Sequence, residues 1–301
     1  MAISQYIKEI GRGKEGARAL SREQAADLMG QVLDGSVTDL EVGAFCLAMR
    51  IKGETPAEMA GFLDATHARI ARVPTTLKPV VVLPSYNGAR KLPVLTPLLA
   101  LLLAREGASV LVHGTPTEAS RITAASVLSV LGTPSLVAMR PLHAGEVVFA
   151  PTGLLLPGLK RLLEVRRVVG LRNPAHSLVK LMSPCEGPSV LVSSYTHPEY
   201  ADSMAATLAL TGQRALLLRG TEGEVVADAR RTPEMTGYLH GQALALQPAQ
   251  AGPLAQVPEL PRDISAESTA SYIQLVLAGK LPVPAPIARQ VQHILHLVEQ
   301  P

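Results

Sequence analysis

Residues 84–91, PSYNGARK, combine a tight turn with two positive charges directly after a short apolar run. The run, residues 80–83 (VVVL), predicts a buried strand, and the Asn-Gly pair predicts the turn. Arg90 and Lys91 follow it, with no carboxylate in the loop. Cationic side chains at a strand end are suited to bind an anionic group such as a phosphate. The loop therefore points either to an enzyme's phosphate site or to a contact with nucleic acid.

Positive charge is concentrated in the middle of the chain. Residues 84–183 contain eleven Lys or Arg against four Glu and no Asp, a net charge of +7, whereas the whole chain carries +3. A single cation of this kind lies more often on a solvated surface than in a site. The concentration as a whole favours a polyanionic partner.

The composition is typical of a packed protein of helices and parallel sheet. Of the 301 residues 47% are hydrophobic and only 3% aromatic, with no Trp, which disfavours an aromatic-rich all-β fold. The length suggests about two domains.

Cys46 and Cys185 have the spacing of neither a zinc site nor a disulfide scaffold, which favours the reducing cytoplasm. The N-terminus lacks the apolar core of a secretion signal. The longest apolar stretch, residues 92–112, is interrupted by prolines and charges, which argues against a membrane span.

Three helices are predicted in the first seventy or so residues. SREQ opens the first, over residues 21–35, as a capping box. The second, over residues 36–53, places apolar side chains at helical spacing on one face, namely Leu40, Ala44, Leu47 and Ile51. The third, over residues 55–70, begins with a Thr cap and Pro at its first position. These helices predict a small helical domain over residues 1–75.

Strands and helices then alternate. Strands are predicted over residues 80–83, 109–114 and 146–151, with helices over 95–107 and 118–132. This alternation predicts a larger α/β domain over residues 76–301 with a mainly parallel sheet. Ligands bind such sheets at the carboxyl ends of strands, where residues 84–91 and 113–120 are both expected to lie.

Several stretches resemble anthranilate phosphoribosyltransferase (TrpD) and the related class II nucleoside phosphorylases. Residues 20–66 resemble the family's N-terminal helical domain. VHG at 112–114 resembles its KHG motif, residues 120–132 its SSGSADVLEALG, and residues 165–184 its VRRxLGxRTxFNxLGPLxNP. The resemblance implies an α/β protein with a small N-terminal helical bundle, joined in space by helices from about 157–183. It also implies a homodimer that forms through the helical domain.

The family's catalytic motifs are not retained. Where the enzymes have a GTGGD loop that approaches the pyrophosphate of phosphoribosyl pyrophosphate, this chain has SYNGA, a degenerate phosphate loop with one glycine. Side chains are expected to fill the space that a glycine-rich cradle leaves open. The loop consists of Ser85, Tyr86, Asn87, Gly88 and Ala89.

The magnesium-binding Asp-Glu pair of the family falls at residues 220–231. Glu224 matches its first carboxylate, but Val225 follows, and Asp228 is too far along to be the second. Magnesium on a diphosphate needs one or two carboxylates beside the substrate oxygens. The resemblance therefore implies the fold without a metal, a cofactor or catalytic residues. The alternative is a magnesium-dependent phosphoribosyltransferase with an altered substrate.

The whole pattern, especially residues 83–91, 95–107, 110–114 and 276–295, resembles the YbiB-type branch of TrpD-like proteins. That resemblance implies a dimeric nucleic-acid binder without sequence preference, and leaves the choice between DNA and RNA open. With few aromatic residues, only Tyr86 and Tyr195 are placed to stack on a base, so phosphate contacts are expected to dominate. A scaffold dimer with an inherited basic pocket remains a third possibility. The expected nucleic-acid contacts are Arg90, Lys91, Arg121, Lys160, Arg161, Arg166, Arg167, Arg172 and Lys180.

Three histidines are weaker candidates for chemistry. His113 lies at a strand end, but an isolated histidine without a nearby Asp or Cys is more often structural than a general base. His293 and His296 have no carboxylate or Cys at ligand spacing. These residues predict neither a catalytic base nor a metal site.

Overall fold

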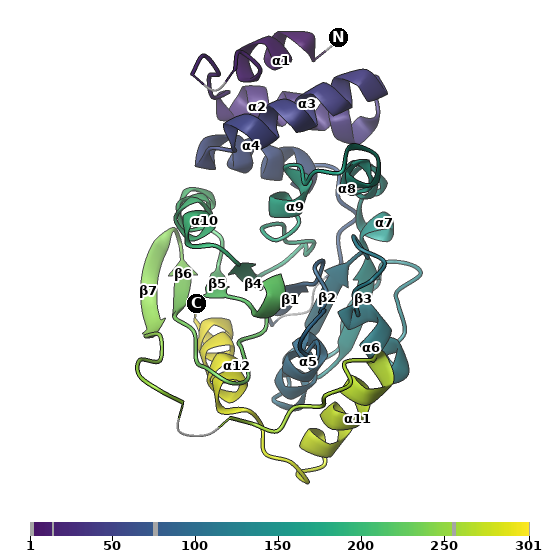
Figure 1. The fold of residues 1–301 in the computed structure, drawn as a ribbon, viewed down its shortest axis with the longest axis vertical. Helices are drawn as coiled ribbons and strands as arrows, with labels where there is room; N and C mark the ends of the chain where they lie inside the picture. The colour runs from purple at the N-terminus through teal and green to yellow at the C-terminus, as the bar shows by residue number, and fades with distance from the viewer. Residues whose placement is uncertain (1–2, 14, 75–77, 255–256, 301) are drawn as a thin grey trace.

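The computed structural model describes residues 3–13, 15–74, 78–254 and 257–300 (Figure 1). The N-terminal helices are α1 (Ser4–Ile10), α2 (Arg22–Asp34), α3 (Asp39–Lys52) and α4 (Pro56–His67). Capping boxes start α2, α3 and α4, and α2 packs along α4. The predicted helical unit is thus present: α2 and α4 begin at the caps that the sequence indicated, α3 begins a few residues later than predicted, and α1 was not predicted. The predicted boundary between residues 75 and 76 lies outside the described residues.

The apolar face that the sequence pattern gave to α3 is exposed to solvent. Leu40 is 84% and Ile51 60% exposed, whereas Phe45 and Met49 are fully buried. The ring of Phe45 packs edge-on against Phe62 of α4, with 6.0 Å between centroids. The helix therefore has two apolar faces, and among the described residues only one of them is buried.

One seven-stranded sheet forms the centre of the α/β unit, in the order β3-β2-β1-β4-β5-β6-β7. Neighbours from β3 to β5 are parallel, and β6 and β7 are antiparallel additions at one edge. This confirms the predicted fold class. The strands are β1 (Val80–Pro84), β2 (Val110–Gly114), β3 (Val147–Pro151), β4 (Ser189–Tyr195), β5 (Ala215–Arg219), β6 (Met235–Leu239) and β7 (Gln242–Gln247).

Helices cover both faces of the sheet, which explains why β1 is apolar and buried along its whole length. Figure 1 shows four of them on the side away from the helical unit: α5 (Thr96–Arg105), α6 (Ala124–Val130), α11 (Ala266–Leu277) and α12 (Ala285–Glu299). Between the sheet and the helical unit lie α7 (Thr152–Leu155), α8 (Pro157–Val169), α9 (Ala175–Leu178) and α10 (Pro198–Thr211).

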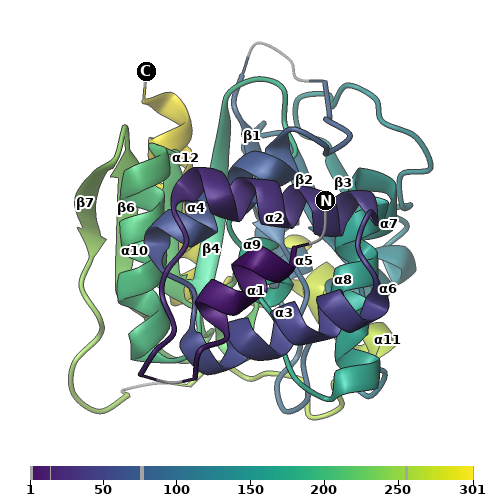
Figure 2. The same cartoon turned by 90° about the horizontal axis from the view of Figure 1, so that it is seen from above.

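The middle of the chain contributes to the helical unit. α8 packs on α2, and α9 and α10 pack on α4; Figure 2, viewed from above, shows α8 and α10 flanking α2 and α4. The carboxyl ends of the parallel strands therefore face a space roofed by helices from the N-terminal part and from the middle of the sequence. None of the described helices combines the length and apolar character needed to cross a membrane.

Strand order places the candidate loops at the switch point of the sheet. β1 pairs with β2 on one side and with β4 on the other, and ligands of open α/β sheets bind where the strand order reverses. The Ser85 amide donates to the carbonyl of His113 at 2.8 Å, and Ala89 and Ile122 exchange backbone hydrogen bonds. The loops after β1 and β2 therefore lie side by side, as expected.

Candidate functional site

The loop after β1 is buried and tightly fitted. Ser85, Asn87 and Ala89 are less than a tenth exposed. Gly88 has φ +64°, and a Cβ there would lie 2.6 Å from the carbonyl oxygen of Ile122. Only glycine combines that backbone conformation with that close approach. The one glycine kept in SYNGA is therefore required by the turn.

The carboxylate of Glu224 fills the space that this loop surrounds. Glu224 is 1% exposed. Its oxygens accept hydrogen bonds from the backbone amides of Gly88 at 2.8 Å and Asn87 at 3.0 Å. The hydroxyls of Ser85 and Thr96 also donate to it. Four donors, three from the loop after β1 and one from α5, thus converge on one carboxylate of the loop after β5.

Glu222 holds the next part of the same loop. Its carboxylate accepts from the backbone amides of Arg90 at 3.1 Å, Lys91 at 3.1 Å and Leu92 at 3.2 Å. It adopts φ +52° inside the short 3₁₀ turn η1 (Thr221–Gly223), a conformation that is unfavourable for a residue with a side chain. The contacts of its carboxylate offset that backbone strain.

Gly223, between the two glutamates, is pressed against the loop after β1. A Cβ at this position would lie 1.8 Å from Nδ2 of Asn87. Its carbonyl accepts from Nζ of Lys180 and Oγ of Ser194, both at 3.1 Å. Burial lowers the pKa of Lys180 to about 8. We call residues 222–224 the carboxylate clasp.

The prediction that Tyr86 can stack on a base is wrong. Its ring is 5% exposed, and its hydroxyl shares a hydrogen bond of 2.9 Å with Nδ1 of His113 and accepts from Oγ1 of Thr152 at 3.1 Å. Burial raises the pKa of Tyr86 and lowers that of His113 to about 3. His113 is therefore a neutral structural residue at neutral pH. Tyr195, the other stacking candidate, lines the cavity described below.

Three of the predicted cations gather around one carboxylate. Glu118, in the loop after β2, pairs with Arg166 at 2.8 Å, with Arg121 at 3.0 Å and with Arg172 at 3.9 Å. Arg121 also donates to the carbonyl of Gly88. We call these four residues the arginine cluster; its net charge is +2.

The cluster holds its charge in a partly buried place. Burial raises the pKa of Glu118, but hydrogen bonds and charge from Arg166 and Arg121 outweigh it and leave that pKa below its usual value. Burial, with the neighbouring Arg166 and Arg121, lowers the pKa of Arg172. Nη1 of Arg166 is buried without a hydrogen-bond partner among the described residues. This nitrogen of Arg166 thus retains unmet capacity to donate to an anion.

The remaining predicted cations are dispersed. Arg90 and Lys91 are exposed beside the carboxylate clasp, and Arg167 is exposed near the end of α8. Lys160 lies 3.8 Å from Glu164 on the same helix. In the first turns of α8, Arg161 donates to the carbonyl of Leu33 near the end of α2, which ties the helix to the helical unit.

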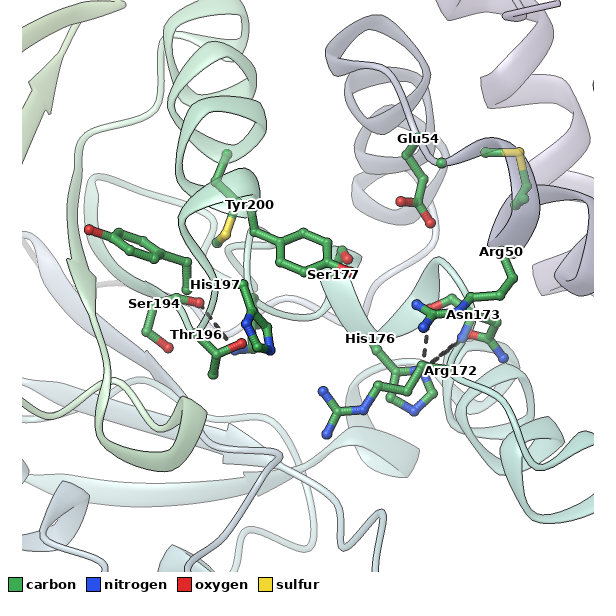
Figure 3. Close-up of a pocket in the computed structure, with 15 residues that line it drawn as sticks. Arg50, Glu54, Arg172, Asn173, His176, Ser177, Ser194, Thr196, His197 and Tyr200 are labelled. Atoms are coloured by element: carbon green, nitrogen blue, oxygen red, sulfur yellow. Dashed lines mark hydrogen bonds between the residues drawn. The ribbon is translucent and has the colours of Figure 1, made fainter. Parts of the chain in front are cut away.

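A cavity of about 280 Å³ lies between the helical unit and the α/β unit (Figure 3). Figure 3 shows Arg172 and His176 facing it beside α9, His197 and Tyr200 at the start of α10, and Glu54 after α3. Burial, with the charge of Arg172, lowers the pKa of His176 to about 4. Burial raises the pKa of Glu54.

The residues present do not fit a magnesium–diphosphate site. Glu224 is already bound by four donors, and Asp228 pairs with Arg230 at 2.7 Å. Within the described ranges, no group of three or more His, Cys, Asp or Glu side chains is placed to hold a metal ion. The position that matches a metal ligand in the enzymes is part of the protein's own hydrogen-bond network here.

Sequence reasoning missed Glu118, Glu222 and Thr96, and it recognised Glu224 only as a remnant ligand. The signals available were that Glu118 follows the predicted strand over residues 109–114, and that Glu222 and Glu224 lie in residues 220–231, which match the family's magnesium motif. Nothing in the linear order shows that residues 222–224 meet residues 85–92.

Comparisons with known proteins agree with this architecture. Residues 4–69 match the helical bundle domain of the glycosyl transferase family. YbiB of Escherichia coli is 40% identical over 298 residues, covering 97% of this chain and 92% of YbiB.

Two solved structures share the fold. Anthranilate phosphoribosyltransferase (TrpD) from Thermus thermophilus matches 98% of this chain and 87% of its own, with a TM-score of 0.73 and 23% identity. The enzyme from Saccharomyces cerevisiae, solved in complex with PRPP and Mg, matches 99% of this chain and 88% of its own, with a TM-score of 0.71 and 15% identity. Fold similarity to the enzymes and the high identity to YbiB lead to one assignment: the chain belongs to the YbiB family of TrpD-like proteins.

Proposed function

We propose that this protein binds nucleic acid through phosphate contacts, with little sequence preference, at the sheet end of a TrpD-like fold. The arginine cluster is the observation that carries the proposal. Three guanidinium groups share one carboxylate there, and guanidinium groups match the geometry of phosphate oxygens. Arg90 and Lys91 add two exposed charges on the neighbouring loop.

The carboxylate clasp supports a binding role over retained phosphoribosyl transfer. The backbone amides of Asn87, Gly88 and residues 90–92 all donate to Glu222 or Glu224. A diphosphate would have to displace both carboxylates to reach those donors. Phosphates of a nucleic acid need not do so, because exposed side chains can reach them from outside the loop.

A homodimer through the helical unit is part of the proposal. Leu40, Leu47 and Ile51 form an exposed apolar face on α3, and apolar residues gathered on a surface are typical of an interaction site. Two basic sheet ends in one dimer would let a polyanion contact both subunits.

A cytoplasmic location is also part of the proposal. The described cysteines, Cys46 and Cys185, are buried and free, which supports it.

A charge-reversal pair tests the function. Arg90→Glu with Lys91→Glu should weaken binding to any oligonucleotide and reduce the slope of log affinity against log salt by about 1.8 for duplex DNA, because each phosphate contact contributes about 0.9. The matched control is Arg262→Glu with Lys280→Glu, two exposed cations on either side of α11. Equal affinity and slope in wild type and Arg90→Glu/Lys91→Glu would refute the proposed contact.

A phosphoribosyltransferase with an altered substrate is the second candidate. The cavity between the two units favours it, because Arg172 and Lys180 line a volume large enough for a small anion. That function requires magnesium-dependent binding of phosphoribosyl pyrophosphate. Calorimetry that detects no heat with or without magnesium removes this candidate.

A further inference from the structure

Four hydrogen-bond donors converge on a single point beside β1. They are the amides of Asn87 and Gly88 and the hydroxyls of Ser85 and Thr96. Successive backbone amides that point into one concavity form a general oxyanion site, whatever the anion. In this chain the anion is a side chain of the chain itself.

We propose that Glu224 is a built-in occupant of an oxyanion site, and that the site takes up a free oxyanion, such as inorganic phosphate or formate, once this carboxylate is removed. Charge-assisted hydrogen bonds to a carboxylate are stronger than neutral ones. An occupant fixed to the chain also has a high effective concentration, which excludes competing anions.

The carboxylate clasp keeps the occupant in place. Glu222 binds three further amides, at residues 90–92, and adopts a left-handed conformation to do so. Lys180 donates to the carbonyl of Gly223, between the two glutamates. The site is therefore closed by a segment that is itself held at three consecutive residues. This inference is independent of nucleic-acid binding, since it concerns donors that the proposed contacts do not use.

Chemical rescue tests the proposal. Glu224→Ala leaves the four donors unpaired and removes an acetate-sized group, so its melting temperature should fall. Formate or inorganic phosphate should then raise that melting temperature by about 3 °C or more above sodium chloride at the same ionic strength. Glu224→Gln is the matched control, because its amide oxygen keeps an acceptor in place and fills the volume. Wild type and Glu224→Gln should show no anion-specific rise.

A refolding measurement covers the case in which Glu224→Ala is unfolded in sodium chloride. Formate or phosphate should then increase the fraction of Glu224→Ala that refolds from urea, relative to sodium chloride at the same ionic strength. The proposal is overturned if Glu224→Ala responds to formate and phosphate no more than to chloride. It is also overturned if phosphate stabilises wild type as much as it stabilises Glu224→Ala. Failure of nucleic-acid binding would leave these expectations unchanged.

Discussion

Glu118→Gln should weaken the fold and strengthen nucleic-acid binding. Glu118 is the shared partner of Arg121, Arg166 and Arg172, and its side chain is 22% exposed. Glutamine keeps the shape and one acceptor but removes the charge, so the net charge of the arginine cluster rises from +2 to +3. The substitution should lower the stability of the fold, because the arginines lose an ion-pair partner. It should raise the affinity for nucleic acid, because the same arginines carry more net charge.

The size of both effects follows from the contacts. Loss of a charged partner from partly buried arginines should lower the free energy of unfolding by about 1–2 kcal/mol. One additional cation available to phosphate should steepen the salt slope by about 0.9 and tighten duplex binding about 5–10-fold at ~0.1 M salt. Urea denaturation measures the first quantity, and fluorescence anisotropy over a salt series measures the second.

A control separates the site from total charge. Glu267→Gln makes the same change at an exposed position in the first turn of α11, and it should leave the salt slope unchanged. Weaker or unchanged nucleic-acid binding by folded Glu118→Gln would refute the assignment of the arginine cluster as a phosphate contact.

Three other variants test the surroundings of the site. Burial lowers the pKa of His113 to about 3, so the unfolded chain binds more protons than the folded chain between pH 3 and about 6.5. The free energy of unfolding should therefore fall as the pH drops through that window. His113→Gln should make the urea midpoint less dependent on pH between pH 7 and 5. Tyr86→Phe removes the hydroxyl bonded to His113 and should lower the free energy of unfolding by about 1–2 kcal/mol in urea; an unchanged midpoint contradicts that role. Leu47→Glu with Ile51→Glu should convert the proposed homodimer to monomers in sedimentation, whereas Val137→Glu, also at an exposed apolar residue, should leave the proposed homodimer intact.

The sequence predicted three of the seven strands, because buried parallel strands are continuous apolar runs, and it missed β4 to β7. Residues 80–83, 109–114 and 146–151 became β1, β2 and β3 within one residue at each end. Periodicity could not tell which face of α3 enters the core, because Leu40 and Phe45 are equally apolar. Packing against Phe62 decides it, and that contact is long-range.

The candidate site was predicted only in part, because it is assembled from loops far apart in the chain. Asn87 and Glu224 are 137 residues apart, and their contact depends on the strand order. Tyr86 was expected to face a ligand, but His113 at the end of the neighbouring strand captures its hydroxyl. Arg166 and Arg172 lie in residues 165–184, which resemble a family motif, whereas their partner Glu118 had no distinguishing pattern.

Salt-dependent binding by the wild-type protein tests the central claim most directly. Labelled single-stranded and duplex oligonucleotides of unrelated sequence would be titrated by fluorescence anisotropy at several salt concentrations. The arginine cluster, with Arg90 and Lys91, predicts similar affinity for different sequences and a log–log salt slope of about −3 to −4 on duplex DNA. Absence of binding even at low salt would contradict the claim and direct attention to the cavity beside Arg172 as a small-anion site.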